Sequence, residues 1–181
     1  MAKHETSPTR PKQAHRRRSL RLQGYDYAQA GAYFVTICTQ DRTCAFGDVV
    51  DRQMRLNGAG QLAAAVWSNM SERFPEIDLD LFVVMPNHLH GIIILSDTGA
   101  ATRAAPTIGD IVGAFKSLFT VQFINGVKDK QWPAFDRRLW QRNYYEHVIR
   151  DEQDLARVRR YIDENPLRWE FDQENPQRPK P

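Results

Sequence analysis

The sequence predicts an α+β fold in which helices pack on a single antiparallel β-sheet. Three observations predict it. Runs of β-branched and aromatic residues recur along the chain, segments with apolar residues at helical spacing lie between them, and 181 residues provide about one domain. No apolar run approaches the roughly 18 residues that a membrane span requires, so we expect no membrane-embedded role.

Strand-like composition recurs in six segments, which are residues 32–39, 46–50, 53–56, 78–85, 89–95 and, as a short strand or an irregular segment, 139–145. The second and third of these flank Asp51-Arg52, which predicts a short hairpin. A turn at Pro86-Asn87 joins the fourth and fifth. Because both of these runs are strongly apolar, we expect them to be neighbouring central strands.

Three helices are expected among these strands. Apolar residues recur at helical spacing over residues 63–74. Thr107 and Asp110 have the spacing of a capping box and begin the second helix. The third helix starts near Asp151, and Pro166 ends it. The order strand, hairpin, helix, two strands, helix, short strand, helix fits a ferredoxin-like or RRM-like α/β sandwich, an architecture that many nucleic-acid binders use.

Charge divides the chain into three parts. Residues 1–22 hold seven basic side chains and one acidic side chain, so the rest of a chain of net charge +3 carries a net −3. We expect residues 1–22 to be a basic, disordered N-terminal arm that contacts a polyanion, with a solubilising tail as the alternative. Residues 23–172 form the domain, and residues 173–181 are a polar, Pro-rich tail. The arm's candidate DNA contacts are Arg16, Arg17 and Arg18.

A second cluster of arginines lies within the domain. Arginine outnumbers lysine there and aromatic residues are interleaved, as expected where guanidinium groups contact phosphates and bases stack on rings. Acidic residues are interspersed as well, so a solvated, salt-bridged face is the alternative. The candidate DNA contacts in this cluster are Arg138, Arg142, Arg150, Arg157 and Arg160.

Two histidines stand in the segment PNHLHG at residues 86–91. Side chains two apart in a strand face the same side, so His88 and His90 project together. Two imidazoles at this spacing can hold one divalent cation. The alternative is a pair of histidines that form hydrogen bonds at the end of a sheet.

Tyr161 and Asn165 are four residues apart on the third expected helix and therefore share a face beside its apolar stripe. By itself such a tyrosine is typically a packed ring with a hydrated hydroxyl. Together with His88, His90 and an arginine-rich surface it suits nucleophilic cleavage of a phosphodiester. A tyrosine with an ordinary pKa near 10 needs a metal for this reaction, and Asn165 offers a carbonyl oxygen as a third metal ligand.

Four segments in order resemble the single-tyrosine transposases with a His-hydrophobic-His motif, especially the REP-associated tyrosine transposases. The segments are YFVTICT, FVVMPNHLHGIIIL, LWQRNYYEHVIRDEQDL and RRYIDENPLRW. The resemblance covers roughly residues 23–172. It implies an HUH-type nuclease domain, and thus a transposase that cleaves and rejoins single-stranded DNA at hairpin-forming repeats.

The resemblance also implies roles for single residues. His88 and His90 match the paired metal ligands, and Tyr161 matches the nucleophile that becomes joined to the 5′-phosphate. Asn165 stands where the better-known insertion-sequence relatives carry Gln, which shortens the reach of the amide by one methylene. The pair Tyr144-Tyr145 is the rival for the nucleophile.

The sequence therefore predicts a metal-dependent, single-stranded DNA endonuclease and strand transferase. Its cofactor is Mg²⁺ or Mn²⁺, its partner is single-stranded or hairpin DNA, and it is a monomer or a homodimer. The start of the chain lacks the apolar core of a secretory signal, and two cysteines are too few for a disulfide framework, so we expect a cytoplasmic, nucleoid-associated protein. Two alternatives stay open: an inactive or domesticated nucleic-acid-binding module, and a metal-dependent hydrolase that uses water as the nucleophile.

Overall fold

A four-stranded antiparallel sheet is the centre of the fold. The computed structural model describes residues 30–96 and 106–178. The strands are β1 (Gly31–Cys38), β4 (Ile77–Met85), β5 (His88–Leu95) and β6 (Tyr145–Ile149), in the spatial order β4-β5-β1-β6. This is the strand order of a β-α-β-β-α-β ferredoxin-like unit, and it confirms the predicted α+β class. The basic arm, with Arg16, Arg17 and Arg18, lies outside the described residues.

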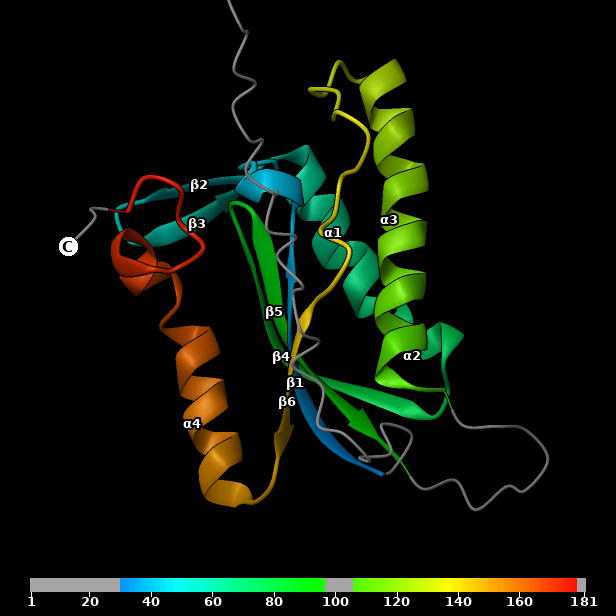
Figure 1. Cartoon of the computed structure of the whole chain (residues 1–181), viewed down its shortest axis with the longest axis vertical. Coiled ribbons are helices and arrows are strands. Elements are labelled where there is room, and N and C mark those ends of the chain that lie inside the picture. Colours follow the sequence, from blue (N-terminus) through cyan, green and yellow to red (C-terminus); the bar gives the residue numbers. More distant parts are fainter. Residues whose placement is uncertain (1–29, 97–105, 179–181) are drawn as a thin grey trace, which may run out of the picture.

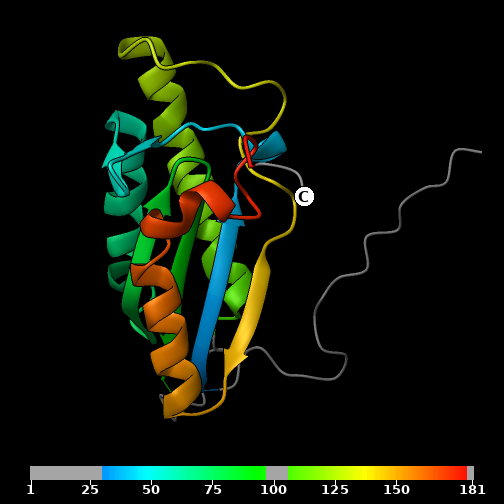
Figure 2. The ribbon, with the colours of Figure 1, turned by 90° about the vertical axis from the view of Figure 1, so that its left-hand side faces the viewer.

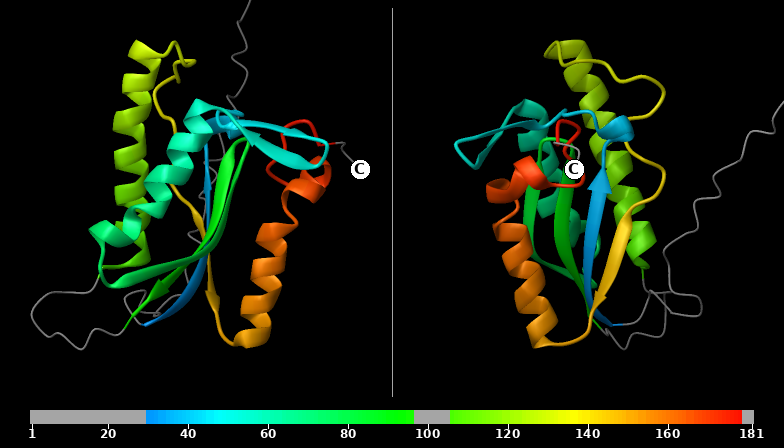
Figure 3. Two further views of the ribbon diagram at one scale, coloured as in Figure 1. Left: turned by 180° about the vertical axis from the view of Figure 1, so that it is seen from behind. Right: turned by 60° about the vertical axis from the view of Figure 1, so that its left-hand side comes forward.

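Helices cover both faces of this sheet. On one face lie α1 (Gly58–Ser68) and α3 (Ile108–Asp129), with the short α2 (Met70–Arg73) after α1; α4 (Glu152–Asp163) lies alone on the other (Figures 1 and 3). The side chain of Asn57 caps α1, that of Asp151 caps α4, and Thr107 and Asp110 form the predicted capping box of α3. Within the described ranges, no helix has the length and apolarity to cross a membrane.

The predicted hairpin forms, but it stays separate from the main sheet. Strands β2 (Gly47–Val50) and β3 (Gln53–Leu56) pair with each other in a two-stranded ribbon. A single 3₁₀ turn, η1 (Gln40–Arg42), connects the end of β1 to this region. Asp51 and Arg52 both have positive φ, as a two-residue hairpin turn requires.

The last strand of the sheet lies further along the chain than expected. Residues 139–144 are largely irregular, and pairing with β1 begins at Tyr145, on the edge of the sheet (Figure 2). Trp140 forms an isolated bridge with Thr39, and the Gln141 N–H donates to the Cys38 carbonyl at 3.0 Å. Lys116 of α3 donates to the backbone carbonyls of Gln141 and Asn143, at 2.9 and 3.2 Å. The Trp140 ring packs in the core against Phe119.

The alternation of side chains in β1 and β5 gives the sheet two different faces. On β5, Leu89 and Ile93 join the large core under α1 and α3, while Ile92 faces α4. His88 and His90 share the face of Ile92, because they differ from it by an even number of residues. The large core is rich in aromatic rings, such as Trp67 packed edge-on against Phe115 at 5.4 Å between centroids.

Candidate active site

His88 and His90 open strand β5 immediately after the turn at Pro86-Asn87, and both are buried on the α4 face. Their ring centroids are 4.4 Å apart. Because the two residues face the same side of the strand, their side chains can contact one common ligand, as the sequence pattern predicts.

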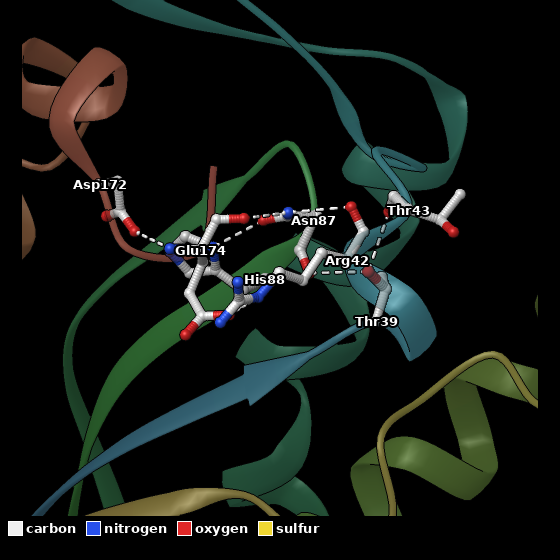
Figure 4. A network of polar contacts seen from close by, with 7 residues as sticks. All are labelled: Thr39, Arg42, Thr43, Asn87, His88, Asp172 and Glu174. Atoms are coloured by element: carbon white, nitrogen blue, oxygen red, sulfur yellow. Dashed lines mark hydrogen bonds and ion pairs between the residues drawn. The ribbon is translucent and has the colours of Figure 1, made fainter. Parts of the chain in front are cut away.

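The amide of Asn87 fixes which nitrogen of His88 carries the hydrogen. The Asn87 Nδ2 donates to the backbone carbonyls of Arg42 and Glu174, at 3.0 and 2.7 Å (Figure 4). This orients the amide so that its Oδ1 lies 2.9 Å from His88 Nδ1. An amide oxygen only accepts, so His88 Nδ1 donates and His88 Nε2 keeps its lone pair. That nitrogen is buried and has no hydrogen-bond partner in the described part of the chain.

Tyr161 of α4 lies directly against His90. Its hydroxyl is 3.4 Å from His90 Nε2, while the other ring nitrogen of His90 lies 2.8 Å from the hydroxyl of Thr36 on β1. Phe34 packs against both rings, with centroids 5.3 Å from His90 and 5.8 Å from Tyr161. These contacts hold the tyrosine and the histidine in a fixed mutual orientation.

Asn165 follows α4 and lies one helical turn beyond Tyr161, with its side chain 2% exposed. Its Nδ2 donates to the carboxylate of Asp172 at 3.2 Å, but its Oδ1 is buried without a partner among the described residues. A buried carbonyl oxygen without a donor costs free energy, so its position calls for a ligand. The oxygen expected as a metal ligand is therefore available.

Asp172 is a candidate metal ligand that the sequence interpretation missed. Ligand atoms of His88, His90 and Asp172 all lie within 4.8 Å of one another, which suits one bound metal ion. Asp172 comes directly after the 3₁₀ helix η2 (Pro166–Phe171), which returns the chain toward the start of β5. The sequence gives no signal for this role of Asp172, because the carboxylate comes close to the histidines only through the tertiary structure.

Burial dominates the electrostatics of the site. It lowers the pKa of His88 to about 4, an effect that the nearby Asp172 and Asn165 oppose. It lowers the pKa of His90 well below the ordinary value, with His88 adding to the effect. Both imidazoles are therefore neutral at pH 7 and can act as metal ligands. Burial, with a smaller contribution from the Asp172 carboxylate, raises the pKa of Tyr161 to about 12.

The rival tyrosines have other contacts. Tyr144 donates to the carboxylate of Glu146 at 2.9 Å. Tyr145 starts β6 on the same face as the site, but its ring contacts Phe34, at 6.2 Å between centroids. The Tyr161 hydroxyl, by contrast, lies 3.4 Å from His90 Nε2.

A broad cleft of about 2120 Å³ opens over this site, and His90, Tyr161 and Asn165 are among its lining residues. Of the arginines expected to bind DNA, Arg138 and Arg142 line the cleft. The others, Arg150, Arg157 and Arg160, are exposed but do not line it, and Arg157 forms an ion pair with Asp154. Arg168, a further member of the arginine cluster predicted within the domain, also lines the cleft, and so does Arg42, which was not predicted.

Comparisons with known proteins agree with this fold. No family model matches the chain. An uncharacterized protein of Haemophilus influenzae is 40% identical over 174 residues, covering 88% of this chain and 93% of that protein. A second Haemophilus influenzae protein, provisionally named a REP-associated tyrosine transposase, is 28% identical over 153 residues, covering 79% of this chain and 74% of its own length.

A solved structure, described as a REP-associated tyrosine transposase bound to a REP hairpin, shares the fold. Its TM-score is 0.52 at 20% sequence identity, over 80% of this chain and 72% of that one. The chain is therefore similar in sequence to a protein named as a REP-associated tyrosine transposase, and it shares the fold of a solved member of that class.

Proposed function

We propose that this protein is a metal-dependent single-stranded DNA endonuclease and strand transferase, with Tyr161 as its nucleophile. One observation carries the proposal. Two buried atoms without hydrogen-bond partners in the described chain, His88 Nε2 and Asn165 Oδ1, belong to residues grouped with Asp172 and Tyr161 in one site. Buried polar atoms are almost always satisfied, so a ligand with positive charge fits this position.

The donor set supports a divalent cation. His88, His90 and Asp172 would hold it, with the Asn165 amide oxygen as a further ligand. Mixed imidazole and oxygen ligation suits Mn²⁺ and also accommodates Mg²⁺. When bound, such a cation polarises a phosphate oxygen and stabilises the negative charge that develops during phosphodiester cleavage.

Tyr161 has the position and the access that a nucleophile needs. Its side chain is 44% exposed, so the hydroxyl can meet a strand in the cleft while the ring stays packed on Phe34. A pKa of about 12 keeps the phenol protonated at pH 7, which supports the need for a cation in the site.

The bond changes in the proposed reaction are simple. Tyr161 Oη forms a bond to phosphorus, its proton passes to water in the cleft, and the bond from phosphorus to the 3′-oxygen breaks. The leaving oxygen takes a proton and becomes a 3′-hydroxyl, while the 5′-phosphate stays joined to Tyr161. Attack of another 3′-hydroxyl on this phosphotyrosine rejoins the strand and restores the tyrosine.

The cleft supports single-stranded or hairpin DNA as the substrate. Four arginines line it, and guanidinium groups bind phosphates well. Arg42 and Arg168 form ion pairs with Glu174 and Glu164, so Arg138 and Arg142 are the first candidates for phosphate contact. Phe171, which is 69% exposed, also lines the cleft and can stack on an unpaired base. One chain supplies every residue of the proposed site, which supports a monomer as the active unit.

The proposal is tested with a panel of hairpins that carry single-stranded flanks, labelled at the 3′ end. With Mn²⁺ or Mg²⁺, and not with chelator, we expect a denaturation-resistant adduct between the protein and the labelled fragment. Tyr161→Phe and His88→Ala should abolish it, and the matched control Tyr145→Phe should retain it. Cleavage that persists without an adduct would favour water as the nucleophile, and binding without any cleavage would favour an inactive binding module.

A further inference from the structure

A second cavity, of about 310 Å³, lies beside the cleft and is not part of the proposed catalytic site. The two spaces share three lining residues, Gln40, Asp41 and Arg138. The η1 turn therefore separates them, and the cavity is continuous with the surface along which a DNA strand would run. Its volume lies at the small end of the range for ligand sites, which suits one small planar group.

Aromatic rings form one wall of this cavity. Phe123 of α3 packs against Trp132 and Phe135, with ring centroids 5.3 and 5.9 Å away. The indole of Trp132 is held in place by two glycines. A Cβ at Gly58 would lie 3.1 Å from the indole, and one at Gly126 would lie 2.2 Å from it. The wall is therefore built before any ligand arrives.

The loops around the cavity have an unusual backbone. Asp41, Arg42, Gln131 and Arg137 are non-glycine residues with φ between 54° and 58°. Asp41 and Arg42 lie in the loop whose residues 43–45 line the cavity, and Gln131 and Arg137 lie in the loop whose residues 132–136 and 138 line it. Side chains rarely adopt this conformation, and such residues cluster at ligand-binding segments.

One cationic side chain, that of Arg138, stands where the cavity meets the cleft. The guanidinium of Arg138 has no hydrogen bond or ion pair with the described residues, so it can receive a phosphate between the cavity and the cleft. Asp41 and Asp136 also line the cavity; the Asp41 carboxylate accepts from Gln40 Nε2 at 2.8 Å and keeps further acceptor positions for the amino group of a base, whereas the Asp136 side chain is 94% exposed.

We propose that this cavity binds one unpaired nucleobase of the single-stranded DNA whose backbone lies in the cleft. The inference rests on the proposed function, because it takes the DNA strand from there. Stacking on an aromatic wall is the general way in which proteins hold an unpaired base, and Arg138 would contact the adjacent phosphate. The cavity would thereby fix the position of the strand relative to Tyr161.

The chain contains a natural reporter for this cavity. Cys44 lines it and is exposed, whereas Cys38 is buried, and burial raises the pKa of the Cys38 thiol to about 12. A maleimide should therefore modify Cys44 first, and Cys44→Ser measures the remaining background. The probe is an oligodeoxynucleotide of about 12 nucleotides, compared with the same backbone made abasic.

We expect the oligonucleotide to slow modification of Cys44 at least about tenfold at saturation, and the abasic strand to leave the rate nearly unchanged. Ala134→Trp fills the cavity from an exposed position, and it should weaken binding of the normal strand about tenfold without changing abasic binding. Ala65→Trp, on the exposed side of α1 and outside both cavities, is the matched control. Phe135→Leu serves the same test if Ala134→Trp does not fold.

Equal protection of Cys44 by both strands, or normal-strand binding that Ala134→Trp leaves unchanged, would overturn the inference while the proposed function stands. A Cys44 rate that rises when residues 1–22 are deleted would also overturn it, since the arm would then occupy the cavity. Failure of the unmodified protein to bind any single strand would instead contradict the proposed function, and anisotropy with labelled DNA detects this separately.

Discussion

The two faces of the four-stranded sheet differ in character, although the same strands supply both. The face under α1 and α3 is packed with apolar and aromatic side chains, such as Leu89 and Ile93 of β5. The α4 face holds His88, His90 and Tyr161. Its unpartnered buried atoms in the described chain, His88 Nε2 and Asn165 Oδ1, carry lone pairs, whereas those on the other face are the indole N–H groups of Trp67 and Trp140. Because strand side chains alternate, one strand can stabilise the fold with every second residue and supply ligands with the others.

Substitutions at two adjacent residues of β5 should show the largest difference between the two faces, because one residue belongs to the site and the other to the core. His88→Ala should reduce strand cleavage on the order of a thousandfold, since a bound cation contributes several kcal/mol of charge stabilisation, while the protein stays folded. Leu89→Ala, one residue further and fully buried, should lower the free energy of unfolding by about 2–5 kcal/mol. Cleavage assays measure the first effect, and urea unfolding of both variants measures the second. Comparable loss of stability in both variants would contradict the division between the faces.

Acid should destabilise the protein through the α4 face. Burial lowers the pKa of His88 to about 4, whereas an unfolded histidine titrates near 6.5. Between these values the unfolded chain binds a proton that the folded chain does not, so stability is lost as the pH falls from about 6.5 to 4. The loss from His88 alone is on the order of 3 kcal/mol. Urea unfolding across this range should show a flatter dependence in His88→Gln, and an unchanged slope would refute the assignment.

Alanine substitutions at two glycines outside the site test how closely the chain is packed on the α1 and α3 side of the sheet. A Cβ on Gly91 would lie 2.4 Å from Cζ2 of Trp67, so Gly91→Ala should cost about 1–3 kcal/mol of stability. Gly113 on α3 faces open space, and Gly113→Ala should stabilise the protein by about 0.5–1 kcal/mol. Thermal unfolding of both variants, followed by calorimetry, measures these changes in stability. A neutral Gly91→Ala would mean that Trp67 moves aside more easily than its buried position indicates.

An effect on the site smaller than that of His88→Ala is expected at Asn87, which positions His88 without acting as a ligand. Asn87→Ala should weaken Mn²⁺ binding about 10–100-fold, because the hydrogen bond that fixes the His88 tautomer is lost. Asn87→Asp keeps an acceptor for His88 Nδ1 but cannot donate to the carbonyls of Arg42 and Glu174. Metal titration by calorimetry should rank the natural protein first, Asn87→Asp second and Asn87→Ala last. Equal Mn²⁺ affinity of all three proteins would show that Asn87 does not position His88 for metal binding.

The local parts of the site could be predicted from the sequence, and the long-range parts could not. His88 and His90 follow from the two-residue period of a strand, and Tyr161 and Asn165 from the four-residue period of a helix. Asp172 could not be predicted, because η2 brings it to the histidines by a path that no periodicity encodes.

The fold shows the same division. Alternating and helical patterns correctly predicted the α+β class and most elements. For residues 139–145 the sequence left a short strand or an irregular segment open; the segment is largely irregular, and strand β6 at Tyr145–Ile149 was not predicted. The separation of the β2-β3 ribbon from the main sheet depends on tertiary contacts and not on local composition.

The most direct test of the account is to identify the tyrosine that becomes linked to DNA. Trypsin cleaves after Arg142, Arg150, Arg160 and Arg168, so residues 143–150 and residues 161–168 fall into separate peptides. Mass spectrometry of the adduct, after nuclease digestion of its DNA, should find the nucleotide phosphate on the peptide of residues 161–168, which contains Tyr161 as its sole tyrosine. A linked nucleotide on the peptide that contains Tyr144 and Tyr145 would contradict the account.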